Sequence, residues 1–67
     1  MQISLNDIAK EVGGQTTVQQ LLNEFHGDKQ NGIAVAVNEN VVPKKEWHSH
    51  LLNEKDNVLI IKATQGG

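Results

Sequence analysis

The most regular segment of the chain is Thr17-Val18-Gln19-Gln20-Leu21-Leu22-Asn23-Glu24-Phe25-His26-Gly27. Its apolar residues stand at positions 18, 21, 22 and 25, the spacing that lines one face of an α-helix. Thr17 followed by Gln20 matches a capping box, and so does Thr16 followed by Gln19. Gly27 suits a left-handed helix stop. We expect one amphipathic helix with its whole apolar stripe in the core, so that Phe25→Ala costs about 3–5 kcal/mol.

Strands are expected on both sides of this helix. Ile3 and Leu5 alternate with polar residues, and Asn6-Asp7 can form a tight turn because both residue types tolerate positive φ. The expected strands cover residues 2–5, roughly 8–12, 33–37, 41–42 and 58–63, with Pro43 ending the fourth. The segment 44–57 is expected to be mostly irregular, with core anchors at Trp47, Leu51 and Leu52.

This order of elements predicts the fold class. One amphipathic helix has one sheet face to cover, which indicates a two-layer α+β roll. With 67 residues and no cysteine, the chain is near the lower size limit of a domain and depends on a single apolar core. We place that domain at residues 1–63 and a flexible diglycine tail at residues 64–67.

The charge balance argues against nucleic acid as a partner. The net charge is −2 and the chain has lysines but no arginine, whereas nucleic-acid-binding proteins usually show a basic excess and arginine forks. No apolar run approaches the roughly 18 residues of a membrane span, and no basic-then-apolar leader opens the chain. We therefore expect a soluble cytoplasmic protein.

The chain ends in Gly66-Gly67, directly behind the apolar run 58–63. In extended form, residues 64–67 would reach about 13 Å beyond the folded body. Two residues without Cβ can pass through a channel that larger residues would block, so a partner's active site could activate the terminal carboxylate. The alternative is a frayed end without a function.

The last strand is apolar on both of its faces. Val58 and Ile60 are expected to face the helix, and one helix cannot cover the other face as well. We interpret the open face as part of a docking patch that orients the tail, with Leu59, Ile61, Ala34 and Ala36 as its members and Ala63 beside them. The alternatives are shielding by the loop around Trp47 and a tolerated apolar surface.

No catalytic or metal-binding set is evident in the sequence. His48 and His50 stand two residues apart and His26 could join them, but structural zinc usually takes four ligands in dedicated spacing. We expect solvated histidines and no metal, and we place Glu54 and Asp56 in a turn. The chain lacks a Gly-rich phosphate loop, a Cys–His nucleophile and a credible Ser–His–Asp set. We interpret it as a co-substrate of other enzymes that binds no cofactor itself.

Several segments also carry a resemblance to a known family. They are Met1-Gln2-Ile3, Thr17-Val18-Gln19-Gln20-Leu21-Leu22, Val35-Ala36-Val37-Asn38, Val41-Val42-Pro43-Lys44-Lys45-Glu46-Trp47 and Gly66-Gly67. In these segments and in length the chain resembles the ubiquitin-like β-grasp sulfur carriers, most closely the ThiS-like carriers of thiamine-thiazole biosynthesis. The resemblance covers essentially the whole chain and is most specific over residues 35–47. It implies a β-grasp roll with a mixed sheet of four to five strands packed on one helix.

The resemblance also implies a reaction and its partners. An E1-like adenylyltransferase (ThiF-like) would adenylate the Gly67 carboxylate with ATP and magnesium, with Gly66 beside it. A persulfide sulfur donor would then displace AMP, and the resulting thiocarboxylate would deliver sulfur to a thiazole synthase (ThiG-like). The residues expected to bind these partners are Leu59, Ile61, Ala63, Thr64 and Gln65.

The chain departs from the family pattern at its turns. ThiS-like chains often carry glycine where Asp7 and Glu39-Asn40 stand here, and Gln65 replaces the small or apolar residue common before the diglycine. Three other functions remain open at this point: the small subunit of molybdopterin synthase, a ubiquitin-like protein modifier, and a β-grasp interaction module whose terminal glycines are incidental.

Overall fold

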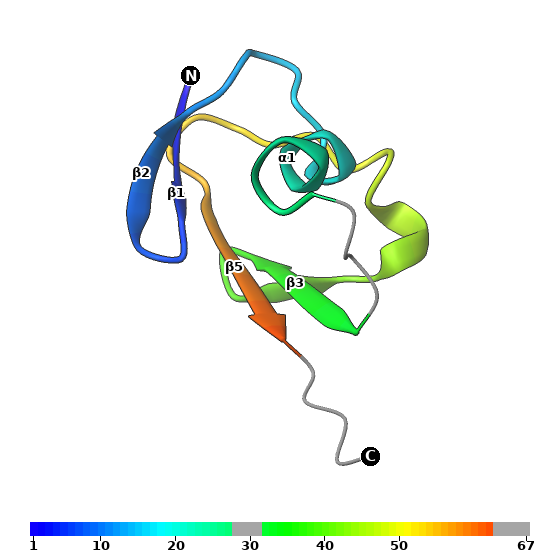
Figure 1. Cartoon of the computed structure of the whole chain (residues 1–67). Helices are drawn as coiled ribbons and strands as arrows, with labels where there is room; N and C mark the ends of the chain where they lie inside the picture. The colour runs from blue at the N-terminus through cyan, green and yellow to red at the C-terminus, as the bar shows by residue number, and fades with distance from the viewer. Residues whose placement is uncertain (28–31, 63–67) are drawn as a thin grey trace.

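The computed structural model describes residues 1–27 and 32–62. In this part of the chain, five strands form one sheet and one α-helix lies across one face of it (Figure 1). The elements are β1 (Gln2–Leu5), β2 (Ile8–Glu11), α1 (Val18–Phe25), β3 (Ile33–Val37), β4 (Asn40–Val42), the 3₁₀ helix η1 (Lys44–Glu46) and β5 (Asn57–Lys62).

The sheet is mixed and has the strand order β2-β1-β5-β3-β4. β1 and β5 run parallel, and the other neighbouring pairs are antiparallel. The first and last strands of the sequence therefore lie side by side in the middle of the sheet (Figure 1). This arrangement confirms the predicted α+β roll of the β-grasp type. Among the described residues, no helix has the length and apolar character needed to span a bilayer.

The helix begins where the sequence placed its capping box. Thr17 Oγ1 accepts a hydrogen bond from the Gln20 N–H (3.1 Å), and Gln20 Oε1 accepts one from the Thr17 N–H (2.9 Å). The capping box is therefore at Thr17, while the Thr16 hydroxyl donates to the Gly13 carbonyl (2.6 Å). At the other end Gly27 has φ = 83°, the predicted left-handed stop.

The segment 44–57 is more ordered than the sequence suggested. It opens with η1, and two of its carbonyls accept hydrogen bonds from the first helical N–H groups: His50 O from Val18 (3.0 Å) and Trp47 O from Gln19 (3.0 Å). These bonds supply partners for N–H groups that a helix leaves unpaired at its start. Trp47 is 2% exposed and its Nε1–H donates to the Val42 carbonyl (2.9 Å), which confirms it as a core anchor.

Two residues expected in the core are not fully buried. Leu51 is 52% exposed while Leu52 is 3% exposed, because Leu51 forms an isolated antiparallel bridge with Thr17 and successive side chains of an extended segment point to opposite sides. Phe25 is 36% exposed, since it is the last residue of a short helix. Its ring lies under the Lys10 Nζ, 5.2 Å from the ring centre. The expectation of a fully buried stripe was wrong at this position.

The turn predicted at Asn6-Asp7 and the turn between the expected strands 33–37 and 41–42 are both present, and both use left-handed backbone. Asn6 and Asp7 have φ of 50° and 68°, and Asn38 and Glu39 have φ of 52° and 73°. Two successive residues with positive φ are typical of the tight turns that match the twist of a hairpin. The second turn contains two residues rather than the expected three, because Asn40 already belongs to β4.

Candidate functional site

β5 is the element that leads to the predicted reactive end. It pairs with β3 from Val37↔Val58 to Ile33↔Lys62 on one side and with β1 on the other. Where β1 ends, the Asn6 side chain continues this edge, because its Oδ1 accepts a hydrogen bond from the Ile60 N–H (2.8 Å). β5 is thus held on both sides as far as Ile60 and, among the described residues, by β3 alone from there to Lys62. The predictions for Gly66 and Gly67, and for Ala63, Thr64 and Gln65, fall on residues outside those described.

The face of the sheet away from the helix is apolar around β5. Leu59 is paired with Ala36 and Ile61 with Ala34, and residues that pair directly across two strands share a face. Val58, which has the opposite orientation, is fully buried on the helix side. Ile61 is 53% exposed and Leu59 is half-buried. The predicted alternation is confirmed for Leu59 and Ile61.

The loop around Trp47 does not shield this face. Trp47 belongs to the core cluster with Val42 and the helix residues, on the other side of the sheet. Leu59 is also more covered than Ile61, so on this face of β5 the exposure increases toward the end of the strand.

The sequence analysis did not identify one residue of this apolar face. Val41 pairs with Ala36, so it lies on the same side as Leu59, and it is 70% exposed. Because successive residues of a strand point to opposite faces, the sequence shows that one of Val41 and Val42 faces away from the core. Only the pairing of β4 with β3 shows which of the two it is. We call the resulting surface the docking face and define it by its five members, Ala34, Ala36, Val41, Leu59 and Ile61.

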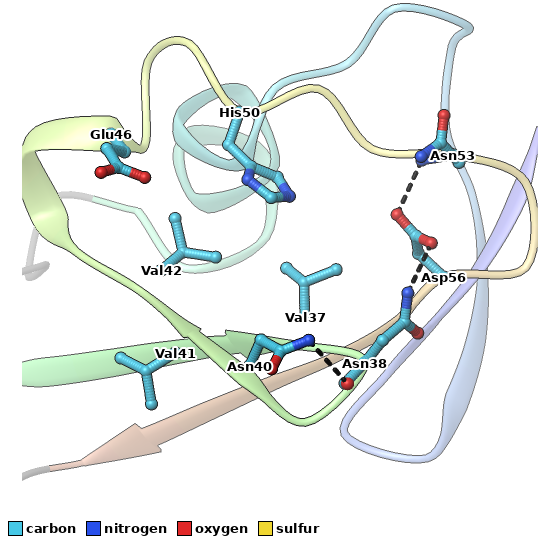
Figure 2. A pocket seen from close by; sticks show the side chains of 9 residues that line it. All are labelled: Val37, Asn38, Asn40, Val41, Val42, Glu46, His50, Asn53 and Asp56. Carbon is cyan, nitrogen blue, oxygen red and sulfur yellow. Dashed lines mark hydrogen bonds between the residues drawn. The ribbon is translucent and has the colours of Figure 1, made fainter.

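A polar contact centred on one buried carboxylate joins the β3–β4 turn to the start of β5. Asp56 is 6% exposed, and its carboxylate accepts hydrogen bonds from Asn38 Nδ2 (2.9 Å) and from the Asn53 N–H (2.7 Å) (Figure 2). Asn38 Oδ1 in turn accepts from the Asn57 N–H (2.9 Å). We call this Asn38–Asp56–Asn57 contact the turn latch. The sequence placed Asp56 correctly in a turn but did not reveal its burial.

The sequence as a whole matches one family. The sequence profile described as the ThiS family matches residues 3–67. The chain belongs to the ThiS family. It is also 34% identical to the sulfur carrier protein ThiS of Escherichia coli strain K12 over 67 residues, which is the full length of both chains.

A solved structure supports the fold of this ThiS family member. The crystal structure of the thiamine biosynthesis protein ThiS from Geobacter metallireducens superposes with a TM-score of 0.84 over the whole of both chains, at 20% sequence identity. At that identity the likeness concerns the fold, and it agrees with the β-grasp topology described above.

The histidines of this ThiS family member are not gathered into one site. His48 is exposed, His50 is half-buried in the loop, and His26 forms the C-cap of α1. Within residues 1–27 and 32–62, no three His, Cys, Asp or Glu side chains are grouped so that they could hold a metal ion.

Proposed function

We propose that this chain is a sulfur carrier for the thiazole of thiamine. The observation that carries the proposal is membership of the ThiS family over residues 3–67, together with the full-length match to a protein named as a sulfur carrier. The fold supports the proposal, because the central strand β5 runs directly into the segment that ends with Gly67.

The proposed chemistry takes place at the Gly67 carboxylate. A carboxylate oxygen attacks the α-phosphate of ATP, which forms an acyl-adenylate and releases pyrophosphate. A persulfide sulfur then attacks the acyl carbon and AMP leaves, which produces an acyl disulfide. A thiol cleaves this disulfide by exchange and leaves the thiocarboxylate. Transfer of that sulfur to the thiazole precursor breaks the acyl C–S bond, and an oxygen atom from water or from the precursor takes its place and restores the Gly67 carboxylate.

In this scheme the chain is a co-substrate and its partners supply the catalytic groups. An E1-like adenylyltransferase holds ATP and magnesium, and a thiazole synthase accepts the sulfur. The side-chain-free residues Gly66 and Gly67 allow the acyl group to enter a narrow active site. Residues 63–65 also bind the partner in this proposal, and the docking face holds the folded body against it.

The proposal is tested by intact mass spectrometry of the full chain. The protein is incubated with the cognate adenylyltransferase, Mg·ATP, a persulfide donor and a thiol. We expect one oxygen to be replaced by one sulfur, with the change located at Gly67 by fragmentation. The matched control is a variant that has one additional leucine after Gly67, and this variant should stay unmodified.

Two other outcomes would contradict the proposal. A ladder of conjugates through lysine side chains would indicate a protein modifier, and an unchanged mass with active enzyme would indicate an interaction module. Thiazole synthase and its other substrates are then added to the thiocarboxylate form of the protein. A thiazole carrier should lose its sulfur to this enzyme, whereas a molybdopterin synthase subunit should keep it.

A further inference from the structure

A polar hollow of about 290 Å³ lies between β4 and the loop that follows it (Figure 2). Its floor contains two buried valines, Val37 and Val42. Its walls are polar side chains from three places in the sequence, the β3–β4 turn, the end of η1 and the turn before β5. They belong to Asn38, Asn40, Glu46, His50, Asn53 and Asp56.

The hollow presents carboxylate, amide and imidazole groups and no lysine. Glu46 and Asp56 supply two carboxylates, and Asn40 and Asn53 supply amide groups whose oxygens can accept hydrogen bonds. The Asn38 oxygen already accepts from the Asn57 N–H. Lys44 and Lys45 are next to Glu46 in η1, but neither lines the hollow.

The two carboxylates differ in what they already bind. Asp56 accepts two hydrogen bonds, one from Asn38 in the turn latch and one from the Asn53 N–H. Glu46 is exposed, and within the described part of the chain its carboxylate has no ion-pair partner. The hollow therefore has a free anionic group at its rim above an apolar floor.

This combination fits one kind of side chain. Arginine has an aliphatic stem that packs on apolar surface and a planar fork of donors that matches a carboxylate and nearby carbonyl oxygens. We propose that the hollow receives an arginine side chain of a partner protein, with the guanidinium on Glu46 and the stem over Val37 and Val42.

The hollow is continuous with the docking face through Val41. This residue lines the hollow and is also a member of the docking face, where it is 70% exposed. A protein that covers Leu59 and Ile61 can therefore place one basic side chain around the edge strand β4. The identity of the partner, an enzyme that handles the carrier, rests on the proposed function. The binding of a guanidinium group in the hollow does not depend on it.

The chemistry is tested first without any partner. ¹⁵N-labelled protein is titrated with n-butylguanidinium chloride at constant ionic strength and followed by ¹H–¹⁵N NMR. We expect saturable shifts centred on the side-chain amides of Asn40 and Asn53. Glu46→Gln should weaken this binding about tenfold, because it removes a charged hydrogen-bond acceptor. Glu24→Gln removes the same charge from the exposed face of α1 and should change nothing.

Three results of this titration would overturn the proposal. They are shifts that do not saturate, equal binding by Glu46→Gln and the unmodified protein, and equal or tighter binding of n-butylammonium, which would indicate a lysine-type site instead. The test does not depend on sulfur transfer, so it can fail or succeed independently of the proposed function.

The partner is then tested by affinity measurements with the cognate adenylyltransferase and thiazole synthase. Glu46→Gln should weaken binding to at least one of them about tenfold at low salt, and Glu24→Gln should bind normally. Normal binding of Glu46→Gln to both enzymes would overturn the assignment of the arginine to these partners.

Discussion

At the scale of single residues, several turn positions have a left-handed backbone although the residue there disfavours positive φ. Glu39 has φ = 73° and Lys55 has φ = 70°, although a residue with a Cβ is destabilised there by about 1–2 kcal/mol. The turn at Glu39 therefore has its shape although the residue there disfavours it.

Glu39→Gly should raise the free energy of unfolding by about 1 kcal/mol, because glycine adopts positive φ without a steric penalty. For a domain of this size that corresponds to a rise in Tm of about 4–8 °C. Glu39→Ala is the control in urea or thermal denaturation, since it removes the charge but keeps the Cβ. If both variants are equally stabilised, the charge rather than the backbone is responsible.

Phe25 and Leu21 lie on the same helical stripe but should differ in their contribution to stability. Leu21→Ala should cost about 2–5 kcal/mol, because Leu21 is completely buried. Phe25→Ala should cost about 1–2 kcal/mol, because part of its ring area stays in water when the protein is folded. Urea denaturation of both variants checks this order, and a larger loss for Phe25→Ala would contradict it.

At the scale of elements, long-range polar contacts hold the two hairpins against β5. In the β1–β2 turn, the Asn6 side chain accepts a hydrogen bond from the Ile60 N–H. In the β3–β4 turn, the Asn38 side chain forms hydrogen bonds with Asp56 and with the Asn57 N–H. Each turn therefore uses an asparagine that accepts positive φ and also fixes the central strand. This explains how a small sheet keeps β5 in place with only two residues of each strand paired between β1 and β5.

Asn38→Gly should lower the free energy of unfolding by about 1–3 kcal/mol, because the buried Asp56 carboxylate and the Asn57 N–H each lose a hydrogen-bond partner while the backbone keeps its preferred φ. Asp7→Gly is the matched control, since Asp7 has φ = 68° in the other turn and its exposed side chain is outside the latch. Equal stability changes in the two variants, measured by urea denaturation, would show that the latch contributes nothing.

At the scale of the whole molecule, the fold separates stability from recognition. The helix, Trp47 and the loop cover one face of the sheet and form the core. The docking face lies on the opposite side of the sheet, around β5. A substitution at its exposed members, Val41 and Ile61, should therefore affect partner binding more than folding.

Ile61→Asp should weaken binding to the cognate adenylyltransferase at least tenfold, because it places a charge in the proposed apolar contact. The free energy of unfolding should change by less than about 1 kcal/mol, since Ile61 is 53% exposed. Ile8→Asp is the control: Ile8 is 59% exposed, and its pairing with buried Leu5 places it on the helix side of the sheet. Calorimetric titration and thermal melts check both variants, and a parallel loss of Tm and affinity in Ile61→Asp would indicate a core role.

The amino-acid sequence by itself determined the parts that depend on near neighbours. The apolar stripe and the Thr17 capping box predict the helix, positive-φ tolerance predicts the Asn6-Asp7 turn, and the ThiS-like segments predict the β-grasp roll. The exposure of Leu51 and Phe25, the membership of Val41 in the docking face and the burial of Asp56 depended on the tertiary structure. Phe25 is exposed because α1 ends there. The burial of Asp56 and the exposure of Leu51 follow from contacts between segments that are far apart in the chain, Asn38 with Asp56 and Thr17 with Leu51. The side on which Val41 lies follows from its pairing with Ala36. Local spacing contains no information on that register, and a shift of one residue would turn every side chain of a strand to the other face.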